Sequence, residues 1–220
     1  MRRRLAITAG VTTVLAVLLL LVYVDWVSKR AQFALRTGRE LSEQKEQPTL
    51  EELRRYYGSK LKVNGCDASG CAYTLTVSNR VLAALHLVPY TEMESYFWVR
   101  NGLVLRNMLD YMTTVDRRYN VTAHADVQFD KECVFALDPW NDSSPFNSNG
   151  LASISSDCSN AEKQAVFGLD TSCLTRLGGC RSVADLLPTI WGHNASKAIE
   201  CRIPNREGFV HSPPSWTWMK

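Results

Sequence analysis

The sequence predicts an α+β protein. An N-terminal transmembrane helix and a helical stalk are followed by one predominantly antiparallel-sheet domain, which contains short helices and disulfides. Three observations predict this class. An uncharged apolar run stands near the N-terminus, period-two alternation marks several strands, and all seven cysteines follow the apolar run. A chain of 220 residues has room for one such domain beside one membrane segment, and a second full domain does not fit.

The apolar run covers Leu5–Val24 and contains no charged side chain. Its twenty residues suit a helix that crosses a hydrocarbon core of about 30 Å. The three arginines at residues 2–4 precede it, and positive charge collects on cytoplasmic flanks, so the N-terminus is expected in the cytoplasm. Tyr23 and Trp26 stand where interfacial aromatic residues belong, although Lys29 and Arg30 reduce the charge asymmetry. The lipid bilayer is therefore the expected partner of residues 5–24.

A cleaved secretory signal is the alternative interpretation of this run. It needs a shorter apolar stretch and small residues three and one positions before the cut. Ala31 has Lys29 two positions before it and Ala34 has Gln32, so no such site follows the run. An uncleaved anchor is favoured, and both interpretations export the rest of the chain to the periplasm or the cell exterior.

The expected layout is then a cytoplasmic N-terminus at 1–4, a transmembrane helix at 5–24, a juxtamembrane helical stalk at 25–48, an extracytoplasmic globular domain at 49–203 and an extended C-terminal tail at 204–220. Residues 1–30 hold five Lys or Arg and one Asp, which leaves 20 basic and 21 acidic residues in the remainder. Because no basic face or nucleic-acid motif is visible there, no nucleic-acid partner is expected.

The cysteines indicate an oxidising compartment. They are Cys66, Cys71, Cys133, Cys158, Cys173, Cys180 and Cys201. Seven is an odd number, so at least one remains outside internal bridges. The expected bridges are local, Cys66 with Cys71 and Cys173 with Cys180, because each pair brackets a glycine-containing turn that brings its ends together.

The first helices are predicted from breakers and caps. Residues 25–47 contain no proline and predict a helix that ends at Pro48. Val27, Ala34 and Leu41 recur every seven residues, but the repeat is too short for a coiled coil, so a solvated spacer helix is favoured. A capping box at residues 49–52 then predicts a short amphipathic helix that ends at Gly58.

The strands are predicted from alternation and turn chemistry. Residues 61–77 predict a hairpin around the Cys66–Cys71 turn, and residues 80–87 a short helix. Asn101-Gly102 predicts a two-residue hairpin with Val99 opposite Val104 and Trp98 opposite Leu105. A third strand is expected at residues 121–129, a loop at 138–150, and strands near 151–155 and 163–169. Short helical turns are expected at 170–179 and from residue 182.

Candidate chemistry is sparse. The four histidines fall in different predicted elements, and no metal or cofactor motif is found, so no cofactor is expected. His124-Ala125-Asp126 places two polar side chains on one face of a strand, as one edge of a metal or acid–base site would, but a solvent-facing strand is the favoured interpretation. Cys173 is the one candidate nucleophile, and its bridge to Cys180 is favoured. The carboxylates Asp110, Asp116 and Asp138 are open candidates for a hydrolase pair.

Trp140, Trp216 and Trp218 are the candidate interaction residues, because aromatic side chains supply large contact areas where proteins meet. No motif along the chain identifies a family. The expectation is a membrane-anchored extracytoplasmic protein of the cell envelope that binds or scaffolds other components, with a possible protein partner and without catalytic activity. The alternative is an anchored hydrolase or thiol-dependent enzyme with dispersed active-site residues.

Overall fold

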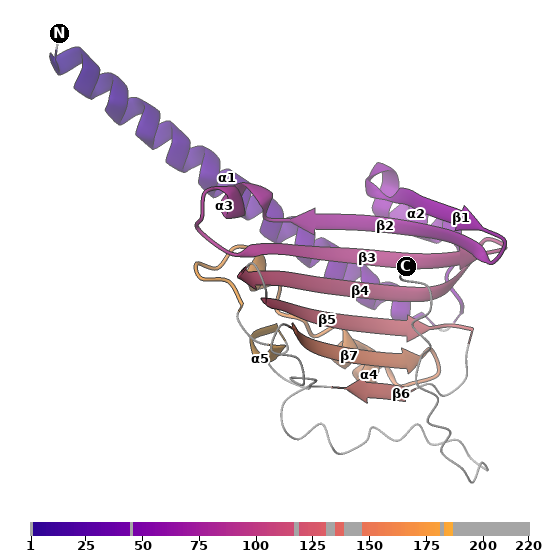
Figure 1. Cartoon of the computed structure of the whole chain (residues 1–220). Helices are drawn as coiled ribbons and strands as arrows, with labels where there is room; N and C mark the ends of the chain where they lie inside the picture. Colours follow the sequence, from indigo (N-terminus) through magenta and orange to yellow (C-terminus); the bar gives the residue numbers. More distant parts are fainter. Residues whose placement is uncertain are drawn as a thin grey trace.

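The protein consists of a long N-terminal helix and a seven-stranded sheet that packs against the helix's second half (Figure 1). The computed structural model describes residues 2–44, 46–116, 119–130, 135–138, 147–180 and 183–186. Trp140, Trp216, Trp218 and the predicted tail at 204–220 lie outside the described residues. The α+β class predicted from the sequence is confirmed.

Helix α1 (Arg2–Ser42) has two halves with opposite surroundings. In the first half, eight Val and Leu side chains between Val11 and Val22 are 51–67% exposed. In the second half, Val27, Ala31, Ala34 and Leu41 are 0–1% exposed and belong to the core. Within the described chain, α1 is the one helix long and apolar enough to cross a membrane, as judged by length and composition.

The expected solvated spacer therefore does not stand outside the domain. Spacings of four, three and seven residues place Val27, Ala31, Ala34 and Leu41 on one helix face, and that face packs on the sheet. Because two of the four residues are alanines, the sequence gives only a weak signal of a buried helix face. Their small side chains let the backbone of the helix approach the strands. The helix ends at Ser42 and not near Pro48. In its last turn, Asn107 Nδ2 donates to Gly38 O at 2.6 Å and to Ser42 Oγ at 2.8 Å.

The sheet is antiparallel except for one parallel pair. Its order is β1-β2-β3-β4-β5-β7-β6, and β5 and β7 run parallel. The strands are β1 (Lys62–Asp67), β2 (Gly70–Ser78), β3 (Tyr90–Arg100), β4 (Leu103–Asp116), β5 (Tyr119–Gln128), β6 (Phe135–Asp138) and β7 (Asn147–Ser155). The remaining elements are α2 (Leu50–Tyr57), η1 (Gly58–Lys60), α3 (Arg80–Ala84), α4 (Asn160–Val166), η2 (Thr171–Leu174) and α5 (Val183–Leu186).

Two local signals predicted in the first half are confirmed, the capping box of α2 and the Asn101-Gly102 turn. Thr49 Oγ1 accepts the Glu52 backbone N–H at 3.2 Å, and the Glu52 carboxylate accepts the Thr49 backbone N–H at 2.8 Å, which is the full capping box of α2. Asn101 and Gly102 have φ angles of 52° and 77°, as the turn between β3 and β4 requires. Short-range sequence signals therefore fix this part of the fold.

The register of the β3–β4 hairpin differs from the prediction by one residue. Val99 pairs with Val104 as expected, but Trp98 pairs with Arg106 and not with Leu105. A bulge places the extra residue Leu105 between these pairs, where its carbonyl accepts the Phe129 N–H at 2.8 Å. As a result Arg106, and not Leu105, lies beside Trp98.

The final third contains the main secondary-structure error. Residues 163–169 were expected as a strand, but residues 160–166 form α4. Ser159 and Glu162 form a reciprocal cap at its start, with Glu162 Oε2 accepting the Ser159 N–H at 2.6 Å. The expected strand at 151–155 is the second half of β7, which begins inside the predicted loop 138–150. Strand β6 also went unpredicted.

Two cysteine pairs lie at disulfide distance, and they are the two that the sequence predicts. The Cα atoms of Cys66 and Cys71 are 4.0 Å apart, and those of Cys173 and Cys180 are 5.2 Å apart. Cys158 is buried, with its Sγ 3.7 Å from Ser155 Oγ. Cys133 and Cys201 lie outside the described residues.

Candidate functional site

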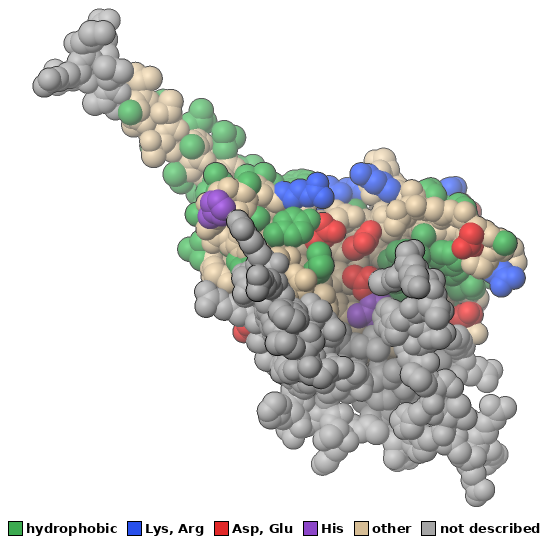
Figure 2. All heavy atoms as spheres, viewed as in Figure 1, with side chains coloured by type: hydrophobic (Ala, Val, Ile, Leu, Met, Phe, Trp, Pro, Cys, Tyr) green, Lys and Arg blue, Asp and Glu red, His purple; other side chains and the backbone are tan. Residues whose placement is uncertain are grey.

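The face of the sheet that points away from α1, called here the distal face, carries a band of polar side chains across β3, β4 and β5. Alternation along β5 separates the two faces. Val121, Ala123, Ala125 and Val127 belong to the core on the α1 side. Thr122, His124, Asp126 and Gln128 therefore point to the distal face. Figure 2 views this face and shows acidic side chains and a histidine gathered over the middle strands.

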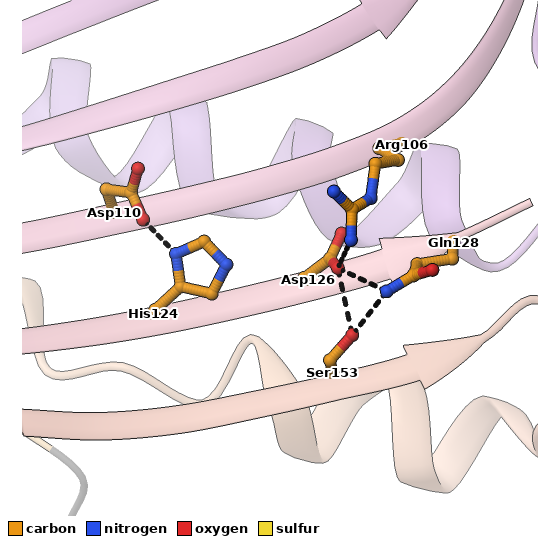
Figure 3. A network of polar contacts seen from close by, with 6 residues as sticks. All are labelled: Arg106, Asp110, His124, Asp126, Gln128 and Ser153. Atoms are coloured by element: carbon orange, nitrogen blue, oxygen red, sulfur yellow. Dashed lines mark hydrogen bonds and ion pairs between the residues drawn. The ribbon is translucent and has the colours of Figure 1, made fainter. Parts of the chain in front are cut away.

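One row of the distal face joins three titratable side chains on adjacent strands. Glu94 pairs with Asp110 in the β3–β4 register, and Asp110 pairs with His124 in the β4–β5 register. His124 Nδ1 is hydrogen-bonded to Asp110 Oδ1 (Figure 3). The side chains of Asp110 and His124 are 41% and 20% exposed, so solvent or a partner reaches this row.

The charges in this row shift one another's pKa values. Burial raises the pKa of Glu94 above its ordinary value, the Asp110 and Glu92 carboxylates raise it further, and hydrogen bonds with Thr74 and Thr76 oppose the rise. Like charges are thus held together on this surface. Glu92, Glu94 and Asp110 are called the acidic stripe below.

The pKa of His124 is raised as well, but for a histidine this shift favours the charged form. Burial by itself would lower the pKa of His124, but the hydrogen bond to Asp110 and the negative charges of Asp110 and Asp126 outweigh that effect. The pKa of His124 therefore lies above its ordinary value. The stripe favours positive charge on this side chain.

Beside this row, three side chains donate hydrogen bonds to one carboxylate oxygen. Asp126 Oδ2 accepts from Arg106 at 3.1 Å, from Gln128 Nε2 at 2.8 Å and from Ser153 Oγ at 2.9 Å, while Gln128 Nε2 also donates to Ser153 Oγ at 2.8 Å (Figure 3). Asp126 is 1% exposed, and desolvation raises its pKa despite the nearby charges of Arg106 and His124. The network is held by three strands, since the parallel pairing of β5 with β7 sets Ser153 beside Asp126.

Two acceptors of this network have no donor among the residues that the structure describes. Asp126 Oδ1 and Gln128 Oε1 are buried and have no hydrogen-bond partner, whereas almost all buried polar atoms in folded proteins do. Both residues are nearly inaccessible, at 1% and 4% exposure. Among the described residues, this network therefore has more buried acceptor atoms than donors to satisfy them.

Two aromatic rings border this group on β3. Tyr96 and Trp98 stack with their centroids 6.4 Å apart and an interplanar angle of 6°. In the strand register Trp98 lies beside Arg106, and Tyr96 lies beside Met108. Carboxylates next to flat aromatic faces suit a cationic group, which both attract.

The structure brings together only part of the candidate set from the sequence. His124 and Asp126 share a face, as predicted, but the favoured solvent-facing interpretation is wrong for Asp126, which is buried in a network. His86 lies apart, in the connection after α3. Cys173 is fully buried at disulfide distance from Cys180, which leaves it unsuited as a nucleophile.

The sequence did not indicate three members of the Asp126 network, namely Arg106, Gln128 and Ser153. The alternation of Thr122, His124, Asp126 and Gln128 along one strand is a signal that could have identified the β5 members. Nothing local connects Ser153 with them, since it stands on a strand 25 residues beyond Gln128. Among the described residues, no group of three or more His, Cys, Asp or Glu side chains is arranged to hold a metal ion.

No protein-family model matches the chain, and no curated protein or solved structure is similar enough to count as a match.

Proposed function

We propose that this chain is a membrane-anchored binding protein of an extracytoplasmic surface, and that its distal face binds a Lys or Arg side chain of a protein partner. The observation that carries the binding role is the acidic stripe, whose Asp110 carboxylate is 41% exposed and lies in one strand register row with Glu94. The proposal has two parts, the anchor and the binding surface, and each rests on separate residues.

The anchor rests on the contrast between the two halves of α1. A soluble protein would bury a run of eight exposed Val and Leu side chains, whereas hydrocarbon solvates them. The arginines at residues 2–4 favour a cytoplasmic N-terminus. Two cysteine pairs at disulfide distance favour an oxidising compartment for the domain.

The binding surface rests on an imbalance of charge. Burial raises the pKa of Glu94, the Asp110 and Glu92 carboxylates raise it further, and a bound cation would neutralise this repulsion. Asp110 is 41% exposed and marks where the partner's side chain enters. Tyr96 and Trp98 supply the aromatic contact that commonly accompanies Lys and Arg at protein interfaces.

The test uses a fluorescent oligolysine peptide and the full-length protein in detergent. Replacing Glu94→Gln together with Asp110→Asn removes the charge of the stripe and keeps the side-chain shapes. Because a charged hydrogen bond contributes about 1.5–3 kcal/mol, the double variant is expected to bind the peptide about tenfold more weakly. The matched control is Glu46→Gln with Glu51→Gln, which removes two charges from exposed positions before and within α2.

Weaker binding by the stripe variant, with unchanged binding by the control, supports the proposed surface. An equal loss in both variants would reduce the effect to net charge. Equal binding by all three proteins would remove the distal face as the binding surface.

An acid–base enzyme is a second candidate, because His124 and Asp110 form one specific feature that favours it. A carboxylate bonded to Nδ1 orients an imidazole and stabilises its protonated form, which is the role of the acid in many catalytic pairs. The test measures hydrolysis of p-nitrophenyl ester and phosphate substrates by the wild type, His124→Asn and His86→Asn. Turnover that only His124→Asn loses would favour an enzyme, and identical rates would exclude this pair as its centre.

A further inference from the structure

Exposed apolar side chains outside α1 gather in two loops of the domain. Among the described residues outside α1, eight large hydrophobic side chains are exposed, and four of them lie in these loops. They are Val81, Leu85 and Leu87 at 46%, 55% and 38% exposure, and Leu177 at 77%. The first loop, residues 80–88, contains α3, and the second, residues 175–179, follows η2. Half of the exposed apolar residues in so few positions indicates a surface and not scattered exposure.

The first loop is fixed to α1 where the apolar segment of that helix ends. The Tyr23 hydroxyl donates to Ser78 O at 3.3 Å and accepts the Val81 N–H at 3.4 Å. Figure 1 shows α3 lying beside α1 at this level, and Figure 2 shows hydrophobic side chains continuing from α1 onto this corner. The loop is therefore held at the height of the last residues of the predicted membrane segment.

The second loop is tied to the first by one buried side chain. Asn79 is fully buried, and its Nδ2 donates to Pro89 O at 2.9 Å and to Leu174 O at 3.0 Å. Its Oδ1 accepts the Thr91 N–H at 2.8 Å. The start of α3, the start of β3 and η2 therefore meet at one residue. The loop with Leu177 is further closed by the Cys173–Cys180 pair, so both loops occupy fixed positions next to α1.

The residues around these loops have the character of a membrane interface. Tyr23 and Trp26 stack with centroids 6.0 Å apart, Trp26 is 49% exposed, and the Arg30 guanidinium lies 5.2 Å from its ring. Arg80 has a side chain that is 76% exposed at the start of α3. Aromatic rings and long basic side chains are enriched where lipid headgroups begin.

We infer that the loops at 80–88 and 175–179 form a second membrane contact, and that their apolar side chains insert at the boundary between the headgroups and acyl chains of a phospholipid bilayer. The inference rests on the proposed anchor, because continuity with α1 identifies lipid as the occupant of this surface. The contact fixes the domain's orientation. Strand β3 begins at Tyr90, directly after the first loop, and runs away from it, so the acidic stripe lies beyond this loop as seen from the membrane.

The test places p-benzoylphenylalanine, a photoreactive residue, at single positions of the full-length protein. Leu85 and Leu177 probe the two loops. Val63, which is 59% exposed on β1 at the opposite end of the sheet, is the control of matched exposure. Leu18, in the exposed half of α1, reports on the anchor. Each protein is reconstituted in nanodiscs of phosphatidylethanolamine and phosphatidylglycerol and irradiated. Intact mass spectrometry then measures the fraction of protein that carries a lipid adduct.

We expect the yield of lipid adduct at Leu85 and Leu177 to approach the yield at Leu18. At Val63 we expect only a background yield. Adduct at Leu18 with only the Val63 background at both loop positions would overturn the second contact and leave the anchor standing. Absence of adduct at Leu18 itself would instead contradict the proposed anchor, so the two failures are distinguishable.

Discussion

Glu94 stands between Glu92 and Asp110 on the distal face, and its charge is unfavourable for folding. Because the pKa of Glu94 is raised in the folded protein, the folded state holds this proton more tightly than the unfolded chain does. Stability is then lost as the pH rises from the ordinary carboxyl pKa through the raised value. A charge that weakens the fold fits a surface kept for binding.

We expect Glu94→Gln to raise the unfolding midpoint at pH 7, and we expect the gain to shrink as the pH falls toward 5. The reason is that the wild-type carboxyl also becomes neutral as the pH falls. Thermal unfolding of the full-length protein in detergent between pH 5 and pH 8 measures this. Glu51→Gln, in exposed α2, is the control with a flat difference, and a wild type more stable than Glu94→Gln at pH 7 would contradict the repulsion.

Asp126 is expected to behave differently, because its carboxylate satisfies three donors. Asp126→Ala leaves Arg106, Gln128 and Ser153 without their shared acceptor. Breaking a buried charged pair costs about 3–5 kcal/mol, and the 27% exposure of the Arg106 side chain places the expected loss near the lower figure. Asp110→Ala, at a side chain 41% exposed, is expected to cost under about 1 kcal/mol. Denaturant unfolding of both variants checks the order, and equal losses would contradict it.

The sequence indicates only half of this site, for a physical reason. Period-two alternation predicts that His124 and Asp126 share a face, since neighbours on one strand are fixed by local geometry. The partners Asp110 and Arg106 lie on β4 and depend on its register with β5, while the bulge at Leu105 shifts the β3–β4 register by one residue and so changes which β4 residues lie beside Trp98. Ser153 depends on a parallel pairing that no local pattern specifies.

At the scale of elements, helix α1 has two roles: its first half is an exposed apolar segment, and its second half packs in the core. Gly38 lies in its buried half, and a Cβ there would meet Asn107 Oδ1 at 3.7 Å and Phe167 at 3.8 Å, which is ordinary contact. Because glycine in a helix interior costs about 0.5–1 kcal/mol relative to alanine, Gly38→Ala is expected to stabilise the protein by that amount. Denaturant unfolding measures the change.

Gly70 provides the opposite case for the same substitution. Its φ is 151°, and a Cβ there would lie 2.5 Å from Val99 O, a backbone atom that cannot move aside. Gly70→Ala is therefore expected to destabilise the β1–β2 hairpin by more than about 1 kcal/mol. A loss of stability in Gly38→Ala comparable to that of Gly70→Ala would contradict the packing described for α1.

Elements whose signals are local were predictable, and those decided by tertiary packing were not. The capping box of α2 and the Asn101-Gly102 turn each act within four residues. The buried role of α1 depends instead on alanines whose burial only the sheet reveals. Helix α4 has a local signal, the reciprocal cap of Ser159 and Glu162, but the short apolar run at residues 165–167 also fits a strand.

At the scale of the whole molecule, α1 continues without interruption from its apolar half into the core. The proposed anchor and the sheet therefore share one rigid element. With the loops at 80–88 and 175–179 beside the helix, the proposed anchor and the proposed second contact would support the domain at two neighbouring points. The distal face, with its acidic stripe, lies on the side of the sheet that the helix does not cover.

The most direct test of an anchored domain on the oxidising side of a membrane is the intact mass of the protein from native membranes. The protein is denatured and alkylated, with and without prior reduction. With four cysteines in the bridges Cys66–Cys71 and Cys173–Cys180, we predict a mass that retains residues 5–24 and at most three labels before reduction, against seven labels after it. Seven labels before reduction, or a mass that lacks residues 5–24, would contradict the account.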